Sequence, residues 1–156
     1  MNEGKLSRIA RRIAAGRRPF LMLVIGLPGS SKSTFARTVS NASHYEADMF
    51  FVDENGNYNF DRNRLKEAHE WCRRMTENDL RNGRNVVVSN TGLTHWERMA
   101  YYEIAEEYGA DIKVKVMTGD YGSIHNVPQE SLDAMRRRYQ PVDQFEIKRY
   151  GIEMMD

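Results

Sequence analysis

The feature that most constrains this chain is a short glycine- and serine-rich segment, GLPGSSKST, at residues 26–34. The spacing of its glycines, lysine and hydroxyl residues is typical of a P-loop, which holds a nucleotide's phosphates and a Mg²⁺ ion. A P-loop lies between a buried strand and a helix. The apolar run FLMLVI at residues 20–25 predicts that strand, and residues 32–41 predict the helix. The segment therefore predicts a binding site for ATP and Mg²⁺.

Ser31 departs from the P-loop pattern because it stands where the second glycine is expected. If this position requires a positive φ, serine costs roughly 1–2 kcal/mol there; otherwise serine is harmless. Lys32 is predicted to bind the phosphates as a catalytic residue, and Ser33 is predicted to bind Mg²⁺. The predicted nucleotide-binding residues are Gly26, Pro28, Gly29, Ser30, Ser31, Lys32, Ser33 and Thr34.

Length and charge predict one domain with a basic extension. A chain of 156 residues that is 40% hydrophobic is long enough to bury a core. We expect a basic arm or short helix over residues 1–18, which either is solvated or attracts nucleic acid, and a single P-loop kinase domain over residues 19–156. The sequence has no apolar run near the ~18 residues of a membrane span and no signal-like apolar core. Its single cysteine permits no internal disulfide. Together these features predict a cytoplasmic protein without a membrane span.

Strand-like and helix-like segments alternate along the chain. Further strands are predicted at residues 44–47, within 85–92 and at 111–118, and further helices at about 62–82, from Thr94 to Gly109, and at about 129–140. Phe145 and Ile147 suggest an edge strand. The alternation predicts an α/β fold of the P-loop NTPase or kinase type, with a parallel sheet of about four to five strands, helices on both faces and a lid loop at 119–128.

Aromatic residues occur in two parts of the chain whose role the sequence also predicts. Asn55-Gly56 predicts a hairpin turn, and its flanking rings are expected to pack in the core rather than to stack on bases. Those rings belong to Phe50, Phe51, Tyr58 and Phe60. Trp96 is likewise expected to pack, on one helix face with Ala100, Ile104 and Tyr108.

The strand ends favour a kinase over other P-loop proteins. No N/T-K-x-D segment of a switch GTPase is visible, and VVVSNT offers Asn90 where an ATPase would carry a strand-end aspartate. A small kinase instead needs a carboxylate that orients the acceptor hydroxyl. Asp48 follows the second predicted strand, and ligands of such sheets bind at the carboxyl ends of strands. Asp48 is therefore the candidate base, and Asp53, farther out on the hairpin, is the weaker one.

The chain contains an ordered set of segments: GLPGSSKST, YEADMFF, GNYNFD, LKEAHEWC, NVVVSNTGLTHWE and IHNVP. Through this set the chain resembles the polynucleotide-kinase-like P-loop kinases, particularly their compact phage and bacterial branch. The resemblance covers residues 20–140. It implies transfer of the γ-phosphate of ATP to a hydroxyl, most typically the 5′-hydroxyl of DNA or RNA, which makes nucleic acid the expected partner. It also implies that Asp48 activates the acceptor, that Ser89, Asn90 and Thr91 border it, and that the loop at 119–128 closes over the nucleotide. His125 is the lid residue predicted to contact the nucleotide.

Three positions depart from that family pattern. Asn90 replaces a strand-end aspartate, and residues 119–128 contain no arginine. Phe51 is predicted to lie in the substrate-binding site, but it stands where the family has an arginine that binds the substrate phosphate. The acceptor therefore stays open between a polynucleotide 5′ end, a hydroxymethylated base in phage-type DNA, and a nucleoside or small alcohol. An ATP-binding module without catalysis is a further alternative. The sequence does not predict an oligomeric state.

Overall fold

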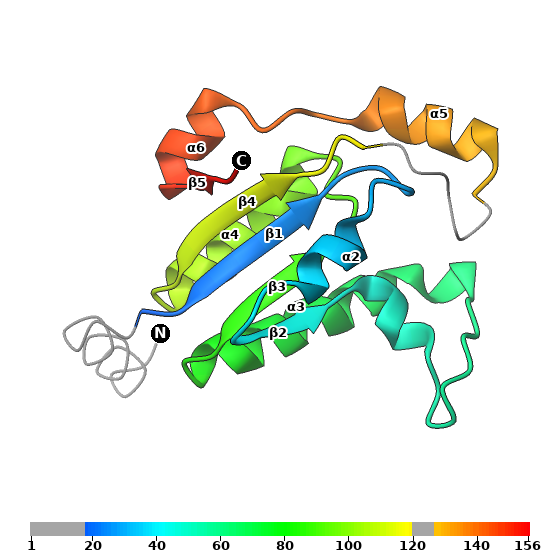
Figure 1. Cartoon of the computed structure of the whole chain (residues 1–156), viewed down its shortest axis with the longest axis horizontal. Helices are drawn as coiled ribbons and strands as arrows, with labels where there is room; N and C mark the ends of the chain where they lie inside the picture. Colours follow the sequence, from blue (N-terminus) through cyan, green and yellow to red (C-terminus); the bar gives the residue numbers. More distant parts are fainter. Residues whose placement is uncertain (1–17, 120–126) are drawn as a thin grey trace.

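A five-stranded parallel sheet forms the centre of the structure, a computed structural model that describes residues 18–119 and 127–156 (Figure 1). The strand order is β2-β3-β1-β4-β5. The strands are β1 (Phe20–Ile25), β2 (Ala42–Tyr45), β3 (Asn85–Ser89), β4 (Asp111–Val116) and β5 (Glu153–Met154). The helices are α2 (Lys32–Arg37), α3 (Leu65–Arg81), α4 (His95–Glu107), α5 (Gln129–Arg138) and α6 (Gln144–Tyr150), with two 3₁₀ turns, η1 (Ala47–Phe51) and η2 (Arg62–Arg64).

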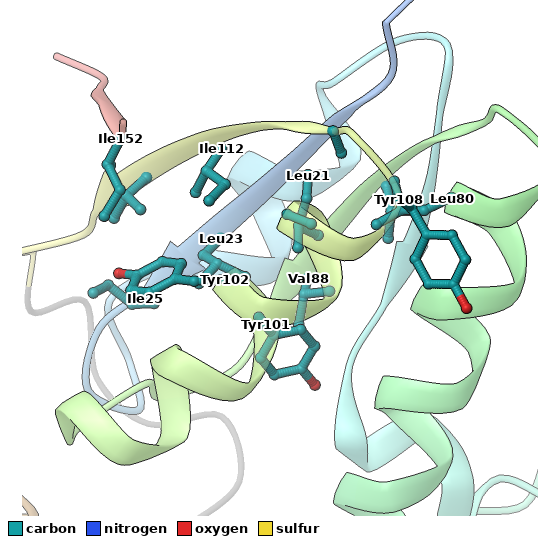
Figure 2. Packing of buried hydrophobic residues seen from close by; sticks show 14 of the residues in the cluster. Leu21, Leu23, Ile25, Leu80, Val88, Tyr101, Tyr102, Tyr108, Ile112 and Ile152 are labelled. Carbon is teal, nitrogen blue, oxygen red and sulfur yellow. The ribbon is translucent and has the colours of Figure 1, made fainter. Parts of the chain in front are cut away.

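Strand β1 is the middle of the sheet and sends alternate side chains to opposite faces. Leu21, Leu23 and Ile25 pack in a cluster with residues of α3 and α4, which Figure 2 shows from close by, and Ile147 and Tyr150 of α6 pack against this cluster. Met22 and Val24 pack on the other face against Ala36 of α2. The period of two in a strand produces this division. The predicted α/β fold, with a parallel sheet and helices on both faces, is confirmed.

Several boundaries differ from the sequence prediction. Helix α2 ends at Arg37, and β2 covers residues 42–45 rather than 44–47. The predicted edge strand at Phe145 and Ile147 is wrong, because these residues lie in α6. The Asp143 side chain accepts a hydrogen bond of 2.7 Å from the Glu146 backbone N–H and so begins a helix there. The edge of the sheet is β5 instead, which pairs in parallel with β4. The predicted N-terminal helix and most of the predicted lid lie outside the described residues.

The buried face of α4 agrees with the prediction only in part, because Tyr108 is buried and Ile104 is partly buried as expected. Trp96 is 74% exposed, so its expected packing role is wrong. The inward face instead presents Arg98, Tyr101, Tyr102 and Ala105 (Figure 2 labels the two tyrosines). Thr94 begins the helix as predicted, and its side chain accepts a hydrogen bond from the Glu97 backbone N–H at 3.2 Å.

A buried ion pair fixes this orientation of α4. Arg98 donates to both carboxylate oxygens of Glu146 in α6, at 2.9 and 3.0 Å, and to the Gly92 carbonyl at 2.6 Å. Tyr102 donates to the same carboxylate. His95, Asp143 and Glu146 lie close enough together to suggest a metal site. Because the guanidinium of Arg98 already occupies the Glu146 carboxylate, we interpret the cluster as a structural link between the two helices.

Burial alone would raise the pKa of Glu146, but the hydrogen bonds from Arg98 and Tyr102 outweigh it and lower the pKa below its usual value. The carboxylate therefore contributes stability above its unfolded pKa and loses that contribution as the pH falls through its folded pKa.

Within the described residues, no helix is long and apolar enough to cross a membrane.

We predict that Glu146→Gln lowers the free energy of unfolding by about 3–5 kcal/mol at neutral pH, because it leaves the Arg98 charge buried without its partner. Urea denaturation measures the change. The matched control is Glu153→Gln, which breaks an exposed pair between Glu153 and Lys113 and is expected to cost less than about 1 kcal/mol. Equal losses for the two variants would contradict the role of the buried pair.

Candidate functional site

The segments that follow β1, β2 and β3 are joined by hydrogen bonds at the carboxyl ends of these strands. The backbone N–H of Gly26, after β1, donates to the Thr91 carbonyl at 3.1 Å. The backbone N–H of Ala47, after β2, donates to the Asn90 side-chain oxygen at 2.9 Å. The Ser33 hydroxyl donates to Glu46 Oε2 at 2.8 Å. The structure thus brings together the P-loop, the Asp48 segment and the end of β3, as expected for segments that follow neighbouring parallel strands.

The start of the P-loop leaves no room for a side chain. A β-carbon on Gly26 would lie 2.6 Å from the Met117 carbonyl oxygen and 2.7 Å from Ser30 Oγ. Ser30 itself is 1% exposed, and among the residues that the structure describes its hydroxyl has no hydrogen-bond partner. A buried hydroxyl without a partner is costly unless a ligand satisfies it. This orphaned oxygen fits a loop that receives a polar group such as a phosphate.

Ser31 adopts the left-handed conformation, with φ 67° and ψ 30°. The position therefore requires the positive φ that glycine adopts freely, and serine is strained there. Ser31 immediately precedes α2 and forms no side-chain capping hydrogen bond. The departure from the P-loop pattern thus leaves the loop geometry intact and costs conformational energy.

Lys32 lies at the first position of α2 and is partly buried. Its ammonium donates to the Leu27 carbonyl at 3.0 Å, so the side chain folds back over the loop. Burial lowers the pKa of Lys32, while the negative charges of Glu46 and Asp48 act in the opposite direction. The lysine and the two carboxylates are therefore close enough to interact electrostatically.

Asp48 lies in η1 and is half-buried. One carboxylate oxygen accepts a hydrogen bond of 3.2 Å from the Tyr58 hydroxyl. Burial and the Asp48 charge together raise the pKa of Tyr58 to about 12, so Tyr58 remains a donor. The weaker candidate, Asp53, accepts hydrogen bonds from the backbone N–H groups of Asn55 and Asn57, both at 2.9 Å. Asp53 is thus engaged in its own turn.

The predicted substrate-binding residues have different surroundings. The Asn90 amide is engaged by other protein groups. Its nitrogen contacts Cys72 Sγ at 3.7 Å and the Tyr101 hydroxyl at 3.5 Å, and its oxygen accepts the hydrogen bond from the Ala47 backbone N–H. Thr91 contributes its carbonyl to the P-loop. Phe51 is 5% exposed and packs against other rings of the hairpin, so it presents little surface to an acceptor. His125 lies outside the described residues.

The hairpin exposes two of the rings that were expected in the core. Tyr58 and Phe60 are 49% and 52% exposed, so the packing prediction is wrong for them. Their rings are nearly parallel, with an interplanar angle of 20° and centroids 6.4 Å apart. The two sides of the hairpin meet in an antiparallel bridge between Val52 and Tyr58.

Sequence reasoning missed Glu46 and the hydroxyl of Tyr58. Glu46 directly follows β2 and lies two residues before Asp48, which was the available signal. The oxygen atoms of Ser33 and Glu46 are the ligand type that Mg²⁺ prefers, so the residues present fit this ion. The neighbouring Lys32, and the Ser30 hydroxyl that no described residue hydrogen-bonds, fit the phosphates of a nucleotide.

A separate groove of about 440 Å³ lies between α3 and α4. Four glutamates and two arginines line it, together with Ala100 and Ile104. It is an open and strongly charged surface on two helices, whereas the P-loop, Glu46 and Asp48 converge at the strand ends. We therefore assign the candidate site by this convergence and not by the size of the groove.

The arrangement defines a class of protein, the P-loop kinases. Residues 21–121 match the family described as an AAA domain (AAA_33), and the chain belongs to that family. It is 30% identical over 155 residues to human NEDD4-binding protein 2; the match covers 90% of this chain, which spans only 9% of that relative's length.

Solved structures agree with this assignment. A chain in the structure of a Pnkp1/Rnl/Hen1 complex is 26% identical, with a TM-score of 0.54, over 75% of this chain and 38% of that one. Kti12 from Chaetomium thermophilum, in complex with ADP-AlF3, matches with a TM-score of 0.61 at 13% identity. The match covers 86% of this chain and 88% of the Kti12 chain, and it concerns the fold. The predicted likeness to polynucleotide-kinase-like P-loop kinases is confirmed.

We predict that Ser31→Gly raises the free energy of unfolding by about 0.5–1 kcal/mol, since relief of left-handed strain exceeds the extra entropy of glycine in the unfolded chain. Thermal or urea denaturation measures the change. Ser31→Ala is the control, because it removes the hydroxyl but keeps the strained β-carbon and is expected to bring no such gain. Equal stabilisation by alanine would show that the hydroxyl, and not the backbone, is the source of the strain.

Proposed function

We propose that this protein is an ATP-dependent kinase that transfers the γ-phosphate to the 5′-hydroxyl of a nucleic acid. One observation carries the proposal: the half-buried carboxylate of Asp48 accepts a hydrogen bond from a hydroxyl group, beside the P-loop lysine. An acceptor hydroxyl that replaced the Tyr58 hydroxyl would lie on the same carboxylate. The 26% identity to a chain of the Pnkp1/Rnl/Hen1 complex supports this reaction class.

The residues divide the chemistry between them. Asp48 orients the acceptor O–H and receives its proton as the oxygen attacks the γ-phosphorus. The new O–P bond forms while the bond from the γ-phosphorus to the bridging oxygen breaks, and ADP leaves. Lys32 stabilises the negative charge of the transferring group. Mg²⁺, when held by Ser33, supplies further neutralisation of the β- and γ-phosphates.

The surface around Asp48 favours a nucleic acid over a small alcohol. Tyr58, the donor to Asp48, forms a nearly parallel pair with Phe60, and about half of each side chain is exposed. Proteins that bind single strands use exposed aromatic rings as platforms for bases. The hairpin therefore offers a surface that extends beyond the acceptor hydroxyl, as a strand end requires.

The assay follows transfer of label from γ-labelled ATP to single-stranded DNA and RNA with 5′-hydroxyl ends. Matched strands with 5′-phosphate ends are the control and are expected to take up no label. Transfer to internal positions of DNA with hydroxymethylated bases, or to a nucleoside, would replace the 5′-end assignment with one of these acceptors. ATP binding without transfer to any of them would favour the non-catalytic alternative.

We predict that Asp48→Asn lowers kcat for labelled-phosphate transfer by about 10²–10⁴-fold, because it removes the group that accepts the proton. The affinity for ADP is expected to change little, since Lys32 and the P-loop remain. Asp53→Asn is the matched control, and its kcat should stay close to that of the unaltered chain. A variant at position 48 with full kcat would exclude Asp48 as the base.

We predict that Phe60→Ala raises KM for an oligonucleotide acceptor and leaves kcat nearly unchanged, because base–aromatic stacking contributes about 1–3 kcal/mol per base. The control is Phe145→Ala, which removes a ring that is 79% exposed on α6, far from the hairpin in Figure 1. Steady-state kinetics with single-stranded DNA measures both. If the two variants raise KM alike, the hairpin rings do not contact the strand.

A further inference from the structure

P-loop proteins of the Ras and ATPase type hold Mg²⁺ with the P-loop serine or threonine and an aspartate at a strand end. Here β3 ends at Ser89 and continues with Asn90, and neither residue carries a carboxylate. Ser89 is 3% exposed, and the Asn90 amide is engaged with Ala47. The end of β3 therefore lacks the negative charge that usually accompanies the P-loop hydroxyl.

Glu46 occupies the corresponding place on the neighbouring strand. In the parallel pairing of β2 with β3, Tyr45 lies opposite Val88, so the next residue, Glu46, comes beside Ser89. Ser89 itself lies opposite Val24 near the end of β1, directly before the P-loop. A carboxylate at position 46 therefore reaches the same edge of the sheet as one at position 89.

The contacts of Glu46 fix it toward the P-loop. Its Oε2 accepts the hydrogen bond of 2.8 Å from the Ser33 hydroxyl, and its Oε1 lies 3.5 Å from His44 Nε2. The same His44 nitrogen is 2.6 Å from Ser89 Oγ. The side chain of Glu46 is 19% exposed. His44 thus links the serine on β3 to the carboxylate that follows β2.

We propose that Glu46 is the carboxylate of the Mg²⁺ site and acts together with Ser33, in place of an aspartate at the end of β3. The proposal rests on the proposed function, because the ion accompanies the nucleotide. Mg²⁺ prefers oxygen ligands, and the Ser33 hydroxyl and Glu46 Oε2, which lie 2.8 Å apart, would offer it two of them. Glu46 would hold the ion directly or through one of the waters that Mg²⁺ retains.

The test measures binding of ADP to the full chain by calorimetry, with and without Mg²⁺, and binding of Mn²⁺ to the ADP complex by electron paramagnetic resonance. Glu46→Gln is expected to weaken Mn²⁺ binding by 10- to 100-fold, roughly the loss seen when a metal site loses a supporting group. The ADP affinity without metal is expected to stay the same. Glu54→Gln, on the hairpin, is the matched control.

A double variant tests the register argument. Glu46→Ser removes the carboxylate after β2, and Ser89→Asp places one at the end of β3. Glu46→Ser alone is expected to lose the dependence of ADP binding on Mg²⁺, and addition of Ser89→Asp is expected to restore it. Persistence of the loss in the double variant would count against equivalence of the two positions.

Two results would overturn the proposal. One is unchanged Mn²⁺ affinity in Glu46→Gln. The other is an equal loss of ADP affinity with and without metal, which would assign Glu46 a structural role in holding Ser33. Because these measurements need no acceptor, failure of phosphate transfer to nucleic acid leaves them valid. A chain that binds no ADP at all would instead contradict the proposed function.

Discussion

The site depends on the position of β1 in the middle of the parallel sheet. β1 pairs with β3 on one side and β4 on the other, and β2 joins the sheet through β3. Because parallel strands end at the same edge, the residues that follow β1, β2 and β3 are neighbours although they are far apart in the sequence. The bonds from Gly26 to Thr91 and from Ala47 to Asn90 join these strand ends.

The P-loop combines a tight fit with local strain. Gly26 is required because a β-carbon would meet the Met117 carbonyl, whereas Ser31 adopts a left-handed conformation without being glycine. Such strain persists only where the surrounding structure fixes the backbone, and it is often found at binding sites. The loop lies between a buried strand and α2, and both hold its ends. The altered residue therefore affects stability more than the shape of the phosphate site.

Much of the fold was predictable because strong local sequence signals specify its strands and helices. The apolar run of β1, the Thr94 cap of α4 and the P-loop spacing each specify a structure within a few residues. The prediction failed where a local cap was overlooked and where packing decided the outcome. Phe145 and Ile147 alternate as in a strand, yet the Asp143 cap begins a helix there, and the contact of Glu146 with Arg98 gives that helix a buried partner. The same ion pair fixes which face of α4 is buried, and Trp96 faces outward as a result.

The sequence by itself determined that this chain has a P-loop between a strand and a helix, with a carboxylate, Asp48, after the second strand. These features are local, and their spacing along the chain identifies them. Only the tertiary structure decided which polar groups surround the loop. Glu46 reaches Ser33 because β2 pairs with β3 in a particular register, and the Asn90 amide is engaged by the backbone of η1. Such contacts join residues 13 to 43 positions apart, and no local pattern encodes them.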